Sequence, residues 1–139
     1  MLVQPYLMFE GRCEEAVEFY RRAVGAEVMT LMRYSQAPDP KACPSPTIDP
    51  QKVMHCCLRV GDSQVMMSDG MCSGTPSFKG INLSLTARDE AEAERLFQGL
   101  SDGGQVQMPM APTFFAKRFG MVADRFGVGW MVISGPMGG

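Results

Sequence analysis

The sequence predicts an α+β fold made of two tandem βαβββ modules within a single domain of residues 1–139. Short runs of alternating apolar and polar residues indicate half-buried strands, and two longer stretches with apolar residues at helical spacing indicate amphipathic helices. The order of these segments repeats along the chain. Tyr20 and Phe97, which are 77 residues apart, hold the same place in the two predicted helices, so we place module 1 at about 1–70 and module 2 at about 79–135.

Length and composition predict one ordinary globular domain, because 45% of the 139 residues are hydrophobic. The net charge of −2 and the pI of about 5.4 give no electrostatic attraction to nucleic acid or to an anionic membrane. We therefore expect no nucleic-acid or membrane partner. The sequence does not begin like a signal peptide, so we expect a cytoplasmic location. The five cysteines are odd in number and contain no CxxC, which excludes a disulfide framework and a zinc ribbon.

The first half opens with a strand and a helix. The apolar run at 5–9 is short and is followed closely by glycine, which favours a strand. Residues 13–24 predict a helix, since apolar residues recur at helical spacing, acidic residues lie in the first turn and basic residues in the last. Gly25 then stops the helix. Further strands are expected at 28–34, 53–60 and 64–68.

Two segments of the first half predict irregular structure. Residues 35–52 contain five prolines, which fix φ and remove hydrogen-bond donors, so we expect a loop or lid rather than a regular element. Residues 69–80 are rich in Gly, Ser and Pro and are expected to link the two halves.

The second half repeats the order of the first. Clean alternation at 81–86 predicts a strand. Asp89 followed by Glu92 is typical of a capping box and should begin a helix that ends at Gly103-Gly104. A strand is expected at 105–110, stopped by Pro109 and Pro112. Two paired strands are then expected at 119–123 and 128–134 around a turn at 124–127, before a frayed tail from Gly135.

The strand predicted at 53–60 contains the only histidine of the chain. Alternate side chains of a strand point to opposite faces. One face would therefore carry His55, Cys57 and Arg59, and the opposite face would be apolar. A face that combines an imidazole, a thiol and a guanidinium is the natural floor of a site.

Each of these side chains has a functional and a purely structural interpretation. His55 could act as a general acid or base, or could be a hydrogen-bonded sheet residue without a role. Cys57 could be a nucleophile beside His55, or a small buried hydrophobe. Arg59 and Arg33 could hold a carboxylate or a phosphate, or could be solvated strand ends.

The loop before residue 119 and two aspartates have alternatives of the same kind. Phe114 and Phe115 lie in a loop that also contains basic residues, and this loop could gate a binding cavity or pack at a dimer contact. Asp69 and Asp124 are not expected to be metal ligands, because aspartates in turns usually bond their own backbone.

Seven motifs are spread over nearly the whole chain. They are Pro5-Tyr6-Leu7-Met8-Phe9, Gly11-Arg12-Cys13-Glu14-Glu15-Ala16, Glu18-Phe19-Tyr20, Met54-His55, Met108-Pro109, Arg118-Phe119-Gly120-Met121-Val122 and Asp124-Arg125-Phe126-Gly127-Val128-Gly129-Trp130-Met131. Together they resemble PhnB-like proteins of the vicinal-oxygen-chelate superfamily, which includes glyoxalase I, extradiol dioxygenases and bleomycin-resistance-like proteins. The resemblance implies that the two modules curl into a cup-shaped mixed sheet with the helices outside, and that the protein is a homodimer.

Some of these relatives carry a demethylubiquinone 3-methyltransferase label. No Gly-rich strand–turn–helix nucleotide signature follows any predicted strand, so we do not expect methyltransferase activity. The superfamily's metal enzymes place ligands on four strands, and these positions map near Pro5, on His55, near Gly80 and near Met131. Of these residues only His55 binds metals well, so we expect no cofactor and no metal. A divalent ion held by His55 with partners such as Tyr6 and Asn82 is the alternative.

The same mapping predicts which residues face the cup and contact a ligand. They are Leu7, Phe9, His55, Cys57, Arg59, Asn82, Ser84 and Met131, with Phe115 from the loop; Thr86, Gly129 and Ile133 share these faces. We therefore expect a metal-free binding protein or resistance-like sequestering module that holds a small, partly apolar molecule in the cup, and this molecule could be anionic. The alternatives are a metal-dependent lyase, isomerase or dioxygenase that uses His55, and a metal-free enzyme with His55 as its base.

Overall fold

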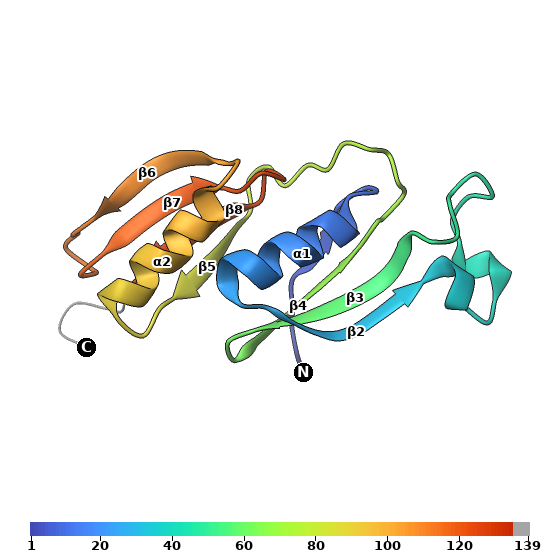
Figure 1. Cartoon of the computed structure of the whole chain (residues 1–139), viewed down its shortest axis with the longest axis horizontal. Coiled ribbons are helices and arrows are strands. Elements are labelled where there is room, and N and C mark those ends of the chain that lie inside the picture. Colours follow the sequence, from blue (N-terminus) through green and yellow to red (C-terminus); the bar gives the residue numbers. More distant parts are fainter. Residues whose placement is uncertain (135–139) are drawn as a thin grey trace. The chain divides into compact units, whose positions relative to one another are not determined.

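The computed structural model of the chain describes residues 1–134, so the tail expected to fray lies outside the described residues. The chain divides into two compact units, Met1–Pro76 and the part that begins at Ser77. Each unit contains one long helix and a four-stranded mixed sheet (Figure 1). The predicted α+β fold of two βαβββ modules is thus confirmed.

The first module has the strand order β1-β4-β3-β2, in which β1 runs parallel to β4 and the other neighbours are antiparallel. Strands β1 and β2 therefore form the two edges of this sheet. The elements are β1 (Tyr6–Met8), α1 (Cys13–Val24), β2 (Glu27–Arg33), β3 (Val53–Val60) and β4 (Ser63–Ser68).

Helix α1 packs its apolar stripe on one face of this sheet. Val17, Phe19 and Tyr20 are buried on the helix, as are Cys56 and Leu58 on β3. Gly25 ends the helix with φ of 67°, and its N–H donates to the carbonyl oxygen of Tyr20. A left-handed residue at this position is readily supplied by glycine, so the predicted helix stop is confirmed.

The proline-rich segment 35–52 is not wholly irregular, which corrects the prediction. It overlaps two short 3-10 helices, Tyr34–Gln36 and Pro40–Ala42. The second forms because Asp39 bonds locally: its carboxylate accepts the N–H of Lys41 at 2.9 Å and its carbonyl accepts the N–H of Ala42 at 3.0 Å.

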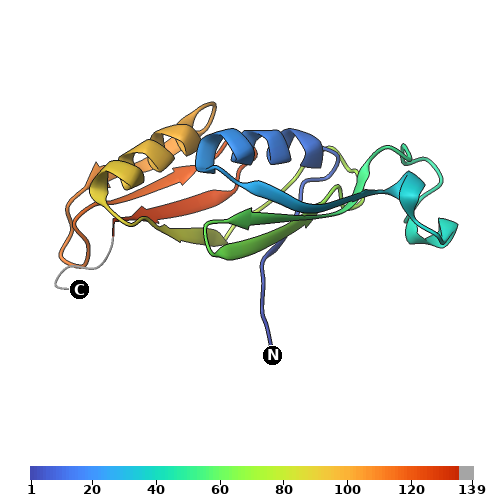
Figure 2. The same ribbon diagram turned by 60° about the horizontal axis from the view of Figure 1, so that its bottom comes forward.

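The second module repeats this topology with the strand order β5-β8-β7-β6, in which β5 runs parallel to β8. Its elements are β5 (Asn82–Thr86), α2 (Glu90–Ser101), β6 (Gln105–Ala111), β7 (Phe119–Ala123) and β8 (Gly129–Ile133). In both modules the long helix lies along one face of its own sheet (Figure 2). Within residues 1–134, no other helix or strand of the same module covers the opposite face, which we call the open face.

Two predictions about the second module have different outcomes. Asp89 caps α2, because its Oδ1 accepts the N–H of Glu92 at 2.8 Å. Pro109 does not stop β6, which continues to Ala111. The strand tolerates proline because β6 is an edge and the register shifts between Met108 and Ala111.

The residue that follows the last strand closes each module in a similar way. Asp69 donates its N–H to the carbonyl of Val53 at 2.9 Å, and its Oδ2 accepts the N–H of Val53 at 2.6 Å. Ser134 donates its N–H to the carbonyl of Arg118 at 3.0 Å, and its Oγ accepts the N–H of Arg118 at 2.7 Å. The two modules thus share this clamp as well as their strand order.

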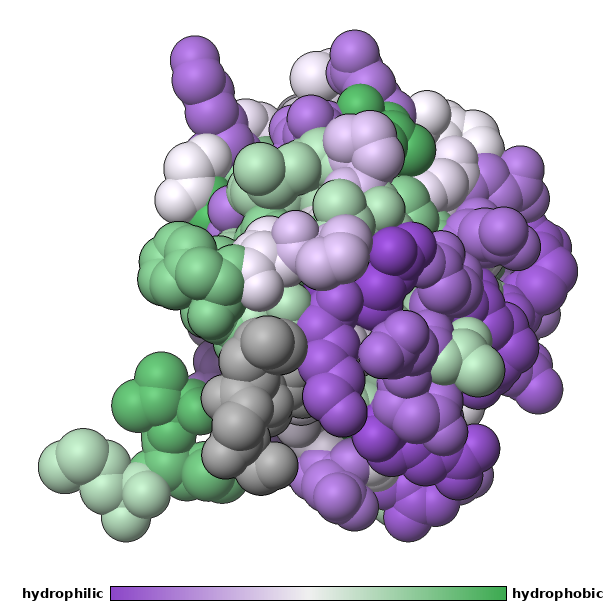
Figure 3. All heavy atoms as spheres, turned by 90° about the vertical axis from the view of Figure 1, so that its left-hand side faces the viewer, coloured by the Kyte–Doolittle hydropathy of each residue, from purple (hydrophilic) through white to green (hydrophobic). Residues whose placement is uncertain are grey.

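In the view of Figure 3, hydrophilic residues cover one half of the visible surface and hydrophobic or neutral residues cover much of the other half. Charged residues such as Glu90 and Arg95 are exposed on α2, whereas Leu96 and Phe97 of the same helix are buried. No helix within residues 1–134 combines the length and the apolar character needed to cross a membrane.

Candidate functional site

The single histidine lies on the open face of the first module and is paired with a tyrosine. The hydroxyl oxygen of Tyr6 is 3.0 Å from Nδ1 of His55. The two rings stack, with centroids 5.6 Å apart and an interplanar angle of 30°. Because β4 lies between β1 and β3, the Tyr6 side chain reaches across one strand to make this contact.

Sulfur-containing side chains share this open face with the pair. Cys57, two residues beyond His55 on β3, is opposite Met66 of β4 in the sheet register. Met32 of β2 is opposite His55. The side chains of His55, Cys57, Met66 and Met32 are each half-buried. The open face therefore combines one hydrogen-bonded imidazole with a thiol and thioethers.

The structure places two predicted contacts on the other face of the sheet. Leu7 and Phe9 are 7% and 0% exposed, and the Phe9 ring lies 6.1 Å from that of Tyr20 on α1. The register explains this, because Leu7 is opposite the buried Met67. The expectation that Leu7 and Phe9 share the face of His55 is therefore wrong. The alternation in β1 instead brings Tyr6 to that face, a residue expected there only as a partner of His55 in the alternative metal site.

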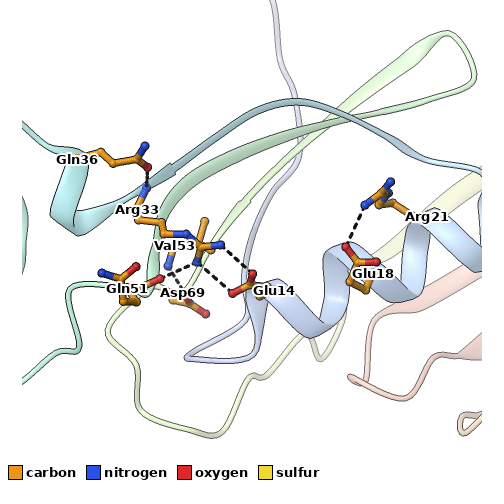
Figure 4. A network of polar contacts seen from close by, with 8 residues as sticks. All are labelled: Glu14, Glu18, Arg21, Arg33, Gln36, Gln51, Val53 and Asp69. Carbon is orange, nitrogen blue, oxygen red and sulfur yellow. Dashed lines mark hydrogen bonds and ion pairs between the residues drawn. The ribbon is translucent and has the colours of Figure 1, made fainter.

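The two arginines near this sheet are already paired with carboxylates. Arg59 reaches the open face as predicted, but its guanidinium donates to Glu27 at 2.5 Å. Arg33 forms a bidentate pair with Glu14 at 2.8 and 3.0 Å and also donates to the carbonyl of Gln51 at 2.7 Å (Figure 4). This pairing lowers the pKa of the Glu14 carboxyl below its usual value. Both guanidinium groups are thus engaged within the module.

The predicted residues of the second module lie on its own open face. Asn82 and Ser84 are exposed on β5, and Met131 is half-buried on β8 directly opposite Ser84. The register extends this row to Met121 of β7. Phe115 is 42% exposed and packs edge-to-face on the buried Phe119, with ring centroids 5.0 Å apart. Alternation thus groups Ser84 and Met131 as predicted.

The two buried aspartates are occupied by N–H groups. Asp124 accepts the backbone N–H groups of Phe126 and Val128 within its own turn and the indole N–H of Trp130 at 2.9 Å. Asp69 instead bonds the backbone of more distant segments, Cys13 and Val53. Among residues 1–134, no three His, Cys, Asp or Glu side chains come together as metal ligands. The donors present thus do not fit the divalent ion of the superfamily's enzymes.

A surface hollow that the sequence did not point to lies at the end of α1. It has a volume of about 440 Å³ and is lined by Glu18, Arg21, Arg22, Gly25 and Ala26. Its charges are partnered, because Arg21 pairs with Glu18 at 3.0 Å (Figure 4) and Arg22 lies over the Phe19 ring. This hollow is therefore a weaker candidate than the open face with His55.

Comparison with known proteins gives matches along nearly the whole chain. The 3-demethylubiquinone-9 3-methyltransferase family matches residues 2–133. Protein YjdN of Escherichia coli (strain K12) is 36% identical over 138 residues, which span 95% of this chain and 94% of that protein.

Solved structures agree with this match. Protein PA1353 from Pseudomonas aeruginosa is 40% identical with a TM-score of 0.82, and the match covers 96% of each chain. The PhnB protein from Bacillus cereus is 27% identical with a TM-score of 0.77, covering 96% of this chain and 98% of that one. The fosfomycin resistance protein FosX from Mesorhizobium loti, at 13% identity and a TM-score of 0.63, shares the fold. The chain therefore belongs to the 3-demethylubiquinone-9 3-methyltransferase family of PhnB-like proteins.

Proposed function

We propose that this protein binds a small, uncharged, partly apolar molecule on the open face of its first module, without a divalent metal ion. The observation that carries the proposal is the pair formed by the Tyr6 hydroxyl and Nδ1 of His55, 3.0 Å apart, on a face of half-buried sulfur side chains. Binding sites for small molecules typically combine such an apolar lining with a few placed polar groups.

The expected charge of the ligand follows from the partners of the arginines. A carboxylate or phosphate would need a cation on this face. Arg59 is the cation that the strand brings there, and it is held by Glu27. An anionic ligand would have to displace that carboxylate, whereas a neutral hydroxyl, carbonyl or amide can bond to the pair directly.

A second candidate function is a metal-free reaction in which His55 is the general base. The contact with Tyr6 favours it, because a hydrogen bond at Nδ1 holds the orientation of the ring, and Nε2 is the basic nitrogen when Nδ1 is the donor in that bond. Within the first module that the structure describes, Nε2 of His55 has no hydrogen-bond partner. This nitrogen could accept a proton from a bound molecule. A metal-dependent reaction is not part of the proposal, since the donor set does not fit such an ion.

We also propose that the remaining predicted residues contact a ligand, each on the open face of its own module. Arg59 and Cys57 belong to the first module, and Asn82, Ser84, Phe115 and Met131 to the second. We also propose a homodimer in the cytoplasm, where a reducing environment suits the five free thiols. We do not propose methyltransferase activity, because the sequence has no Gly-rich strand–turn–helix signature for a nucleotide cofactor.

Ligand binding can be tested through the ring signals of the single histidine. A panel of neutral probes (phenol, 4-methylphenol and indole) would be titrated to millimolar concentration while proton and carbon spectra of His55 and of the methionine methyl groups are recorded. We expect saturable shifts of His55 and Met66, and weaker binding in Tyr6→Phe, which removes only the hydroxyl.

The matched control is Tyr34→Phe, which also removes a tyrosine hydroxyl in the first module, one that donates to the carbonyl of Gly70 at 3.3 Å. It should bind the probes as wild type does. The proposal is overturned if no probe moves His55 and Met66, or if Tyr6→Phe and Tyr34→Phe bind equally. Proton transfer by His55 needs a separate test with His55→Gln, which keeps hydrogen bonding but cannot act as a base. Loss of turnover of a substrate in this variant would support the role of His55 as base, and retained turnover would exclude it.

A further inference from the structure

We propose that the open face of the first module forms a site for a soft monovalent metal ion, such as Cu(I), held by His55, Cys57 and Met66. The inference goes beyond the proposed function, because it requires no organic ligand and assigns Cys57 and Met66 a role as metal donors rather than as lining. Its ligands would be Nε2 of the imidazole, Sγ of the thiolate and Sδ of the thioether.

The sheet register brings the three donors together. His55 and Cys57 are two residues apart on β3 and therefore project to the same face. Met66 on β4 is directly opposite Cys57. Side chains directly opposite one another have Cβ atoms about 4.5–5.5 Å apart. A methionine with three rotatable bonds can place its sulfur beside the thiol from that position.

A fourth donor lies on the other side of the histidine. Met32 of β2 is directly opposite His55. All four side chains are half-buried, so an ion can enter from solvent while part of its surroundings is apolar. The arrangement thus offers two thioethers, one on each neighbouring strand, around a histidine and a cysteine.

The histidine is oriented in the way that metal ligands usually require. Metal-bound histidines generally donate their other ring N–H to a fixed partner, which sets the tautomer. Here the Tyr6 hydroxyl oxygen lies 3.0 Å from Nδ1 and can accept a hydrogen bond from it. A proton on Nδ1 leaves the Nε2 lone pair available for an ion.

The donor types select the class of metal. Thiolate and thioether ligands favour Cu(I), whereas Mg²⁺ and Mn²⁺ prefer oxygen donors and Zn²⁺ prefers thiolate, imidazole or carboxylate. Of the carboxylates near this face, Glu27 is bound by Arg59. Binding would release the proton of the Cys57 thiol to solvent, one for each ion, with no change in the oxidation state of the metal or the sulfur.

The test uses Ag(I), an air-stable analogue of Cu(I), and protein carrying Cys43→Ser and Cys72→Ser. These changes remove the two half-buried thiols outside the proposed site, while Cys13 and Cys56 are buried. Labelled methionine methyl groups and the His55 ring would be followed by NMR. We expect one equivalent of Ag(I) to shift Met66 and His55 first, and the exposed Met8, Met29 and Met71 only with excess.

Variants separate coordination from apolar packing. Met66→Leu keeps the volume and the apolar character but removes the sulfur, and should weaken Ag(I) binding by at least about tenfold, as Cys57→Ser should. The control Met29→Leu changes an exposed methionine of β2 and should leave the affinity unchanged. Equal effects of Met66→Leu and Met29→Leu, equal shifts of all exposed methionines, or equally tight binding of Zn²⁺ would overturn the proposal.

The outcomes also distinguish this site from the neutral-ligand site. Met66→Leu and Cys57→Ser should weaken Ag(I) binding far more than they weaken binding of the phenol probes, whereas Tyr6→Phe should weaken the probes most. If Ag(I) binds as described and no probe does, the proposed function alone fails. If the probes bind and Met66→Leu leaves the Ag(I) affinity unchanged, the metal site alone fails.

Discussion

The carboxylate of Asp69 accepts the backbone N–H of Cys13, 56 residues earlier in the chain, at 2.8 Å. Cys13 is the first residue of α1, and the preceding Arg12 has no acceptor in its side chain with which to cap the helix. The second carboxylate oxygen of Asp69 accepts the N–H of Val53, where β3 begins. One buried side chain therefore fixes both the start of the helix and the start of the strand that contains His55.

Replacement of Asp69 by alanine should be strongly destabilising. Two buried N–H groups would lose their acceptor, at a cost of about 1–3 kcal/mol for each. We expect the free energy of unfolding, measured with urea, to fall by about 2–6 kcal/mol. Asp69→Asn, which keeps one acceptor oxygen, should lie between alanine and wild type.

The control for this series is Asp62→Ala, in an exposed turn between β3 and β4. It should change the stability by less than about 0.5 kcal/mol. Equal stabilities of Asp69→Ala and Asp62→Ala would show that the Asp69 hydrogen bonds contribute nothing to folding.

The pair of Glu14 and Arg33 should make part of the stability depend on pH. The guanidinium holds the folded-state pKa of Glu14 below its usual value of about 4.5. The contribution of the pair is therefore fully present above that value and is lost as the pH falls through the folded-state pKa. The free energies of unfolding in urea of wild type and of Glu14→Gln should differ at neutral pH and converge in acid. The difference should be small, because Glu14 is largely exposed.

Glu90→Gln gives the comparison for that measurement. Glu90 lies in the first turn of α2, as Glu14 lies in the first turn of α1, but forms no ion pair within residues 1–134. Its substitution should leave the pH dependence of wild type almost unchanged. If the difference in the free energy of unfolding between wild type and Glu14→Gln widens in acid, the Glu14–Arg33 pair is not the source of this pH dependence.

The five thiols should divide into two classes of reactivity. Cys13 and Cys56 are 0% exposed, and burial raises the pKa of Cys56 to about 11 and that of Cys13 still further. Cys43, Cys57 and Cys72 are half-buried. Since the thiolate is the nucleophile, iodoacetamide at pH near 8 should modify only the second class in native protein.

Peptide mapping by mass spectrometry after brief labelling measures this division. All five sites should be modified once the protein is unfolded in urea. Modification of Cys13 in native protein, at a rate near that of Cys43, would mean that the α1 face of the sheet opens readily.

The predicted homodimer remains to be measured. Each module has an edge strand with exposed apolar side chains: Val28 and Met29 on β2, and Val106 and Met108 on β6, each 39–49% exposed. Association would cover such surface. Light scattering at micromolar concentration should give twice the mass of one 15.2 kDa chain, and a monomeric mass would contradict the prediction.

The sequence predicted the elements better than it predicted the site. The bounds of α1, the cap at Asp89 and the face of His55, Cys57 and Arg59 depend on local periodicity or local capping, which the sequence displays directly. The face to which each β1 side chain points was predicted wrongly, because this strand has three residues, which are too few to show a clear alternation. The pairing of Leu7 with the buried Met67 determines which side chains of β1 point to the helix.

Long-range contacts account for the other failures. The meeting of Tyr6 with His55 depends on two strands placed on either side of β4, and nothing in the local sequence around Tyr6 signals it. The bond from Cys13 to Asp69 is of the same kind. The pairing of Arg59 with Glu27 depends on which strands are neighbours, so the sequence alone could not exclude an anion-binding role.

Pro109 also limits how β6 can meet another chain. A proline and two register shifts interrupt this edge, so it cannot present a continuous ladder of donors and acceptors. A strand from a second molecule could not extend the sheet along its full length. Any partner of β6 must therefore bind through side chains such as Val106 and Met108, and fibrillar growth by strand addition at this edge is disfavoured.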